Sequence, residues 1–169
     1  NESFSDMWGE WIDLTNGDGN DVPSVRWLMG EDIPGIGAIR NMAKPPSFGD
    51  PDRKGSPLWY TGSGDNGGVH TNSGVGNKLC YLLTDGAAFN GKTVMGMGIS
   101  AAADLFYEVQ TNLLTSGVDY ADRVAAHGGA LRSEVVKAKK KKIVSSNVKV
   151  SALSKIKTGA KAKPSAKKR

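Results

Sequence analysis

Apolar side chains recur at helical spacing in three segments of the chain, and each segment predicts a helix. The segments are residues 4–12, residues 75–83 and residues from about 100 to 114. In each, apolar positions follow the i, i+3, i+4 rule that places them on one helix face. Long loops and little strand-like alternation lie between them, so the pattern predicts a mainly α fold. The predicted apolar faces are Phe4, Met7, Trp8, Trp11 and Ile12, then Val75, Leu79, Leu82 and Leu83, then Ala102, Phe106, Val109 and Leu113.

Polar residues mark where these helices begin and end. Asn72 and Ser73 are natural N-terminal caps for the second helix, because their side chains accept hydrogen bonds from free backbone N–H groups. The segment from Thr15 to Asp21 is rich in Asn, Asp and Gly and predicts a loop. Such oxygen-bearing side chains also suit Ca²⁺, but the segment lacks the EF-hand pattern with its closing glutamate. A plain polar turn is therefore the favoured interpretation.

Charge divides the chain into two parts. Residues 1–134 contain all 17 acidic residues and 9 Lys or Arg, a net charge of 9 − 17 = −8, whereas residues 135–169 contain 13 Lys or Arg and no acid. This pattern predicts an acidic globular body followed by a basic tail that is expected to be disordered. The tail has no aromatic side chain to stack on bases, so a nucleic-acid partner is disfavoured.

Cysteine content and hydropathy say little about the cellular compartment of the protein. Cys80 is the single cysteine, so no internal disulfide forms and the redox compartment is left open. No apolar run approaches the roughly 18 residues of a membrane-spanning helix, and a membrane partner is not expected.

The candidate chemistry centres on one histidine beside a glycine pair. In the stretch Asp65–Gly74, Gly67 and Gly68 allow positive φ values and a close approach by a ligand. Asp65 lies five residues before His70, so it is placed to hold one ring nitrogen while the other donates to a substrate. On this pattern alone, a surface-turn histidine is the simpler alternative.

This stretch resembles the segment around the catalytic histidine of thermolysin-like neutral zinc metallopeptidases, the gluzincins that include the bacillolysins. Five further segments resemble the same family in the same order, and the resemblance extends over roughly residues 1–122. The segments are Asn1–Gly9 (family pattern NExxSDxxG), Trp27–Ile33 (WxxGED), Ala38–Met42 with Pro45 and Pro46 (LRxM), Gly49–Asp52 (GDPD), and Asn77–Leu83 (NKxxYLL).

The resemblance implies a fold and an activity. The fold is the compact helical bundle of the family's C-terminal domain. The activity is that of a zinc metalloendopeptidase, which hydrolyses peptide bonds in a peptide or protein substrate with a zinc-activated water.

The resemblance also implies residue roles. Glu2 matches the third zinc ligand, Asp6 matches a carboxylate that orients a zinc-bound histidine, and His70 matches the group that stabilises the oxyanion. Asp65 would orient His70, and Arg40 would bind a substrate carbonyl.

Two further sets of positions match family sites less completely. Ile33 and Ile39 fall near the family's apolar pocket for the residue that follows the cut. Asp13 and Glu31 fall at calcium-ligand positions, but two other such positions are occupied by Arg26 and Leu28. This departure argues against a double-calcium site and leaves a single ion as an alternative.

The family's main zinc motif is absent. No His-Glu-x-x-His occurs, and the histidines are His70 and His127 only. We therefore expect this chain to be the C-terminal half of a secreted two-domain enzyme, inactive without the half that carries the motif. Residues 123–169 are expected to lie outside the family, with a frameshifted reading as one hypothesis. The alternative is a non-catalytic domain whose basic tail binds nucleic acid or an acidic partner.

Overall fold

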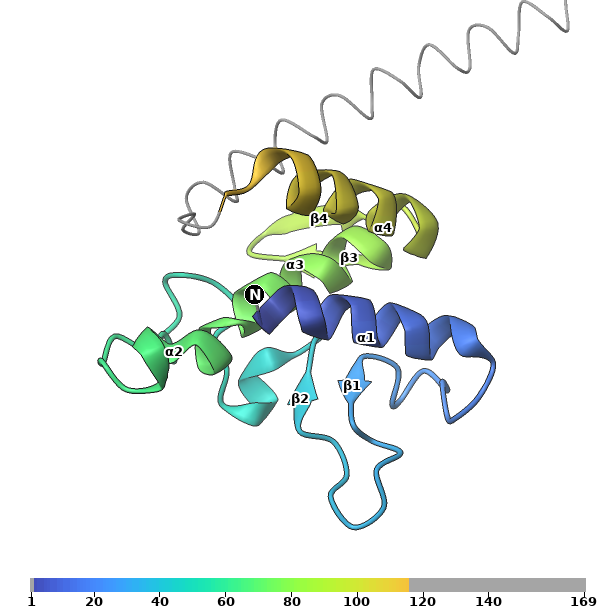
Figure 1. The fold of residues 1–169 in the computed structure, drawn as a ribbon, viewed down its shortest axis with the longest axis horizontal. Helices are drawn as coiled ribbons and strands as arrows, with labels where there is room; N and C mark the ends of the chain where they lie inside the picture. The colour runs from blue at the N-terminus through green and yellow to red at the C-terminus, as the bar shows by residue number, and fades with distance from the viewer. Residues whose placement is uncertain (1, 116–169) are drawn as a thin grey trace, which may run out of the picture. The chain divides into compact units, whose positions relative to one another are not determined.

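The computed structural model describes residues 2–115, and these residues are mainly helical, as the sequence predicts (Figure 1). The chain divides into two units, residues 1–107 and residues 108–169, and only residues 108–115 of the second are described. The predicted basic tail lies outside the described residues. None of the described helices is long and apolar enough to cross a membrane. The helices are α1 (Glu2–Asn16), η1 (Pro45–Phe48), α2 (Asp65–Asn72), α3 (Gly74–Thr84), α4 (Ile99–Glu108) and η2 (Val109–Leu113).

Two short antiparallel hairpins complete the described fold. Strands β1 (Leu28–Met29) and β2 (Arg40–Asn41) pair with Leu28 opposite Asn41, and β3 (Gly86–Phe89) and β4 (Lys92–Met95) pair with Phe89 opposite Lys92. The second hairpin turns at Asn90 and Gly91, both with positive φ (49° and 70°). Asn-Gly is the preferred pair for such a turn, so this hairpin carried a sequence signal that the sequence analysis did not use.

The first unit has an aromatic core formed by α1 and α4. Phe106 packs edge-on against Phe4 and Trp11, with ring centroids 6.2 and 5.6 Å apart. Trp11 also donates a buried hydrogen bond from Nε1 to Thr84 Oγ1 of α3 (3.2 Å). Met7 is fully buried. The apolar face predicted for residues 4–12 therefore joins all three predicted helices.

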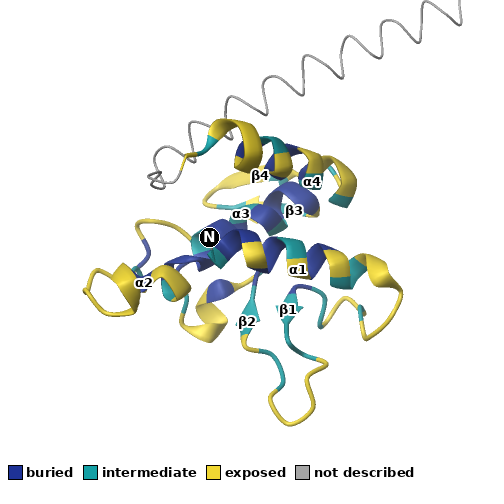
Figure 2. Cartoon of the chain, in the orientation of Figure 1, coloured by how far each residue is buried: buried dark blue, intermediate teal, exposed yellow. Residues whose placement is uncertain are grey.

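Three positions of α1 depart from simple polarity. Ile12 is 64% exposed, although the pattern placed it on the apolar face. Asp6 and Glu10 are 7% and 4% exposed, although acidic side chains usually lie in solvent. The reason is visible in Figures 1 and 2: α1 has neighbours along two sides, α3 on one and the β1–β2 hairpin on another. A helix covered on two sides buries polar positions as well as apolar ones.

The third predicted helix ends earlier than its pattern indicates. α4 covers Ile99–Glu108, and the second unit continues as a π-helical turn at Val109–Leu113. Ala102 and Phe106 are buried as expected, and so is Val109, but Leu113 is 44% exposed. The stripe predicted at helical spacing therefore fails where the regular helix stops.

The inward face of α3 is also more polar than its sequence indicates. Val75 and Leu79 are half-buried, whereas Asn77 and Cys80 are 1% and 0% exposed. Ser73 occupies the predicted cap position, but its hydroxyl donates to the His70 carbonyl (2.5 Å) and caps no helix N–H. Ser73 therefore joins α2 to α3.

The closest approach of α1 to α3 occurs at Gly76. A Cβ added to Gly76 would lie 2.6 Å from Cβ of Ser3 and 3.3 Å from Cε of Met7. Real side chains do not pack at 2.6 Å, so only glycine allows the two helices this separation. The neighbouring residues Glu2 and Asp6 of α1 are thereby brought close to α2 and α3.

The variant Gly76→Ala should therefore destabilise the chain. Overpacking of a tight interface typically costs about 1–3 kcal/mol, and thermal unfolding followed by circular dichroism should show a lower midpoint. Gly9→Ala is the matched control, because a Cβ at this exposed α1 position meets nothing within 4 Å. It should raise stability by about 0.5–1 kcal/mol through helix propensity. Equal midpoints for the two variants would contradict the close approach.

Candidate functional site

The turn before His70 has the backbone geometry that its glycines indicate. Gly67 and Gly68 have φ values of 82° and 77°, and Asp65 and Asn66 also have positive φ (51° and 47°). Four successive positive φ values tighten the chain so that Asp65 faces the residue five positions later. Non-glycine residues in this region are strained, and such strain concentrates at functional sites.

Asp65 holds His70 at two points. Its Oδ1 lies 2.5 Å from His70 Nδ1, and its Oδ2 accepts the His70 backbone N–H at 3.0 Å. The hydrogen bond to Asp65 raises the pKa of His70 above its usual value, and the same bond lowers the pKa of Asp65. The contact therefore fixes the ring and favours its charged form, as expected from the sequence.

The second ring nitrogen of His70 faces α1. Nε2 lies 3.3 Å from Oε2 of Glu2, and both side chains are partly exposed, at 55% and 38%. Residues that lie 68 positions apart in the chain thus share one open site. A cation bound by Glu2 would lie within reach of substrate atoms that contact His70.

A second polar group surrounds Asp6. Its Oδ1 lies 3.4 Å from Nη1 of Arg40, and its Oδ2 accepts a hydrogen bond from Nδ2 of Asn77 (2.7 Å). Asp50 lies near both Asp6 and Arg40, and burial raises the pKa of Asp50 above its usual value while the Arg40 charge opposes the shift. Arg40 is therefore held by carboxylates at the edge of the site, with 21% of its side chain exposed.

The two isoleucines that the sequence singles out lie together on the β1–β2 connection. A Cβ at Gly30 would meet Ile33 Cδ1 at 3.3 Å and Ile39 Cγ1 at 3.6 Å, so both side chains flank this glycine. They are 45% and 50% exposed. Ile39 is the residue before Arg40, which links this apolar surface to the charged group.

The described residues do not form a complete zinc site by themselves. Residues 2–115 contain no group of three His, Cys, Asp or Glu side chains placed to hold a metal ion. A catalytic zinc site needs about three protein ligands. Glu2 fits as one carboxylate ligand with an open side toward His70, so the other ligands would have to come from another segment.

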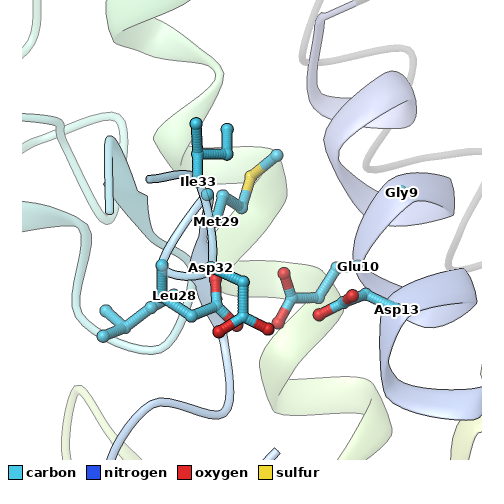
Figure 3. A pocket seen from close by; sticks show the side chains of 9 residues that line it. Gly9, Glu10, Asp13, Leu28, Met29, Asp32 and Ile33 are labelled. Carbon is cyan, nitrogen blue, oxygen red and sulfur yellow. The ribbon is translucent and has the colours of Figure 1, made fainter. Parts of the chain in front are cut away.

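Carboxylates gather at a separate pocket of about 210 Å³ between α1 and the residues after β1. Figure 3 shows the carboxyl groups of Glu10, Asp13 and Asp32 directed toward one another, and Glu31 also lines the pocket. Burial, followed by the charge of Glu31, raises the pKa of Glu10 to about 8, and burial also raises the pKa of Asp13 and Glu31. Carboxylate oxygens are the donor type that Ca²⁺ prefers, but these side chains are not placed close enough, as described, to hold a metal ion.

The two departures from the family's calcium positions have structural uses. Arg26 donates from Nε and Nη2 to both oxygens of Asp85 (3.0 and 3.2 Å), and Trp27 Nε1 donates to the same carboxylate (2.6 Å). Leu28 begins β1 and lines the pocket. The Arg26 guanidinium is therefore engaged by Asp85.

Three residues of these clusters were missed by sequence reasoning. Glu10 precedes Asp13 by one helical turn, and Asp32 follows Glu31 directly, so helical spacing and adjacency were available signals. Asn77 carries no comparable signal, because it contacts Asp6 across 71 residues.

Comparison with known proteins identifies the family of this chain. The family model of the thermolysin metallopeptidase alpha-helical domain matches residues 1–152. A zinc metalloproteinase of Renibacterium salmoninarum is 45% identical over 141 residues, which cover 80% of this chain and 25% of the relative. A bacillolysin of Brevibacillus brevis is 45% identical over 119 residues (68% and 20%), and a thermolysin of Alicyclobacillus acidocaldarius is 40% identical over 130 residues (75% and 22%).

The chain thus spans a quarter or less of the length of these relatives. The matched range continues past residue 122, where we expected the family's segment to end. That boundary lies outside the described residues and stays a prediction.

The raised pKa of Glu10 predicts a specific pH dependence of stability. The folded state holds the Glu10 proton up to about pH 8, whereas an unfolded glutamate releases it near its ordinary pKa of 4.5. Stability from this group is therefore present below pH 4.5 and is lost as pH rises toward 8, by at most about 1.4 kcal/mol per pH unit. Glu10→Gln mimics the protonated side chain and should be more stable than the parent at pH 8 but not at pH 5.

Urea unfolding at the two pH values measures this difference. Asp104→Asn, at an exposed position of α4, is the control and should shift both values equally. If Glu10→Gln also shifts both equally, Glu10 is not the group that titrates in this window.

Proposed function

The chain belongs to the thermolysin metallopeptidase family, with the alpha-helical domain as the matched part, and we propose that it contributes substrate binding and oxyanion stabilisation to a zinc metalloendopeptidase. The observation that carries this proposal is the line of contacts from Asp65 through His70 to Glu2. It places a charged donor beside a carboxylate that suits a metal. Both face an open site where a peptide can enter.

His70 is the proposed oxyanion donor. Attack on a peptide carbonyl develops negative charge on its oxygen, and a preorganised donor aimed at that oxygen lowers the barrier. Asp65 contacts Nδ1 and raises the pKa of His70, which favours the doubly protonated ring whose Nε2 can donate a proton. Glu2 lies close enough to Nε2 that a metal on Glu2 and a donor on His70 can act on one carbonyl group.

Arg40 and the adjacent isoleucines are the proposed substrate-binding groups. The guanidinium of Arg40 presents several donors in a rigid plane, which suits carbonyl oxygens of an extended peptide. The contact of its Nη1 with Asp6 Oδ1 (3.4 Å) restricts the side-chain rotamers of Arg40, so less conformational entropy is lost when substrate binds. Ile33 and Ile39 offer exposed apolar surface next to it for the side chain that follows the cut.

Zinc, when bound, polarises the scissile carbonyl and lowers the pKa of the attacking water. Glu2 is the proposed ligand from this chain, and a partner segment with His-Glu-x-x-His is proposed to supply the rest. Asp6 would orient an imidazole of that segment. We further propose secretion of the whole enzyme, in keeping with its family.

A single calcium ion is the proposed occupant of the acidic pocket. Asp13 and Glu31 are the ligands expected from the sequence, and Glu10 and Asp32 line the same pocket. These side chains would have to move closer together to hold the ion, because as described they are not placed to do so. The ion would compensate the charge of Glu10, whose carboxyl group burial otherwise keeps protonated near neutral pH. Its role would be to stabilise the junction of α1 with the β1 hairpin.

The catalytic proposal is tested in the two-domain enzyme, with this chain joined to its His-Glu-x-x-His segment. His70→Ala should leave zinc content intact and lower kcat by about 10²–10³, the usual cost of one oxyanion donor. KM should change less, because the contact strengthens mainly as charge develops. Asp65→Asn should show a milder form of the same defect.

Glu2→Gln is the contrasting variant and should lose zinc and activity together. The negative control is this chain without the His-Glu-x-x-His segment. It is expected to show no peptidase activity and to bind zinc weakly. Zinc content and kcat, measured side by side, decide the roles. If His70→Ala empties the site of zinc, His70 is a ligand and the proposed oxyanion role is wrong.

The calcium proposal predicts cation-dependent stability of the 169-residue chain. Ca²⁺ should raise the thermal midpoint more at pH 8 than at pH 5, because the ligands must be ionised. Glu10→Gln should reduce this gain, Asp104→Asn should keep it, and Mg²⁺ should give little of it because it prefers stricter geometry. If the thermal midpoint is unchanged in excess Ca²⁺, the proposal that calcium binds in this pocket is wrong.

A further inference from the structure

Asn77 contacts the candidate site without touching His70 or Glu2. It lies on α3 with 1% of its surface exposed, and its Nδ2 donates to Asp6 Oδ2 at 2.7 Å. Arg40 lies 3.4 Å from the other oxygen of Asp6. Each oxygen of this carboxylate therefore has one donor, and the two donors come from different elements, α3 and β2. The plane of the carboxylate is fixed between them.

The other end of the Asn77 amide has no partner. Among the residues that the structure describes, Asn77 Oδ1 is the one buried side-chain oxygen or nitrogen atom without a hydrogen-bond partner. Burying an unsatisfied carbonyl destabilises a fold, whereas an apolar side chain of similar shape would avoid that cost. We infer that the amide at this position is useful for its N–H donor rather than for its carbonyl oxygen. That donor, Nδ2, contacts Asp6.

We propose that Asn77 is a positioning residue for the metal chemistry, acting through Asp6. This inference rests on the proposed function, in which Asp6 orients an imidazole bound to zinc. A carboxylate can orient that ring only if it is itself held in one plane, and Asn77 supplies the hydrogen bond that holds its Oδ2. Arg40 alone would leave the carboxylate free to rotate about its remaining contact.

The magnitude follows from the chemistry of such supporting contacts. Removing a group that orients a metal ligand typically costs about 10–100-fold in metal affinity or activity. Asn77 acts one contact further away, so we expect a loss of about 10-fold, near the lower end of that range. The loss should fall on kcat and on zinc retention, because Asn77 is 1% exposed and is therefore shielded from a bound substrate. KM should change little.

Three variants of the two-domain enzyme distinguish a role of Asn77 in orienting Asp6 from a role in core packing alone. Asn77→Leu keeps the approximate shape and removes the donor. Asn77→Ser is smaller but keeps a hydroxyl that donates to Asp6 directly or through a water. Thr84→Val is the matched control on the same helix: Thr84 is 2% exposed and accepts a buried hydrogen bond from Trp11, but it does not contact Asp6.

The readouts are kcat, KM, the rate of zinc loss to a chelator, and the thermal midpoint. We expect Asn77→Leu to lose about 10-fold in kcat and to release zinc faster, with Asn77→Ser partly restored in both. Thr84→Val should lose thermal stability but keep kcat and zinc. If kcat instead follows the thermal midpoint across all three variants, or if Asn77→Leu keeps full activity, Asn77 is a packing residue and the inference is wrong.

The outcome is separable from that of the proposed function. An unsubstituted enzyme without zinc-dependent peptidase activity overturns the proposed function, and the inference with it. An active unsubstituted enzyme with an equally active Asn77→Leu variant overturns the inference alone.

Discussion

The close approach of α1 to α3 at Gly76 is the constraint on which the candidate site depends. With Ser3 packed against the helix at a position that admits no side chain, the first turn of α1 is fixed beside α2 and α3. Glu2 then reaches His70, and Asp6 reaches Asn77. A wider separation would leave these polar groups in water, where their contacts would be weak and their positions undefined.

The same packing makes α1 a helix with two different buried sides. One side carries the aromatic residues that join α4, and it stabilises the first unit by burial of apolar surface. The other carries buried carboxylates, which cost stability because burial opposes their charge. Asp6 is paired with the Arg40 cation, and Glu10 lies at the acidic pocket for which a calcium ion is proposed.

The parts of the site that are local in sequence were predictable. Asp65, the glycine pair and His70 lie within six residues, so their spacing alone indicated a turn that brings carboxylate and imidazole together. The family resemblance extended this to Glu2, Asp6 and Arg40, because those residues lie in recognisable segments. Asn77 was missed because a buried amide has no spacing pattern and takes its meaning from a contact across 71 residues.

The sequence by itself located the three longest helices, apart from the end of the third, and the tight turn before His70, because periodicity and glycine placement are properties of neighbouring residues. Tertiary structure decided which faces are buried: Ile12 is exposed and Glu10 enclosed, since α1 is covered along a side that its apolar pattern did not select. Tertiary structure also determined the two-residue strands β1 and β2, because each is a strand only by its hydrogen bonding to the other. Each of these depends on the distance between segments, and that distance is set by packing.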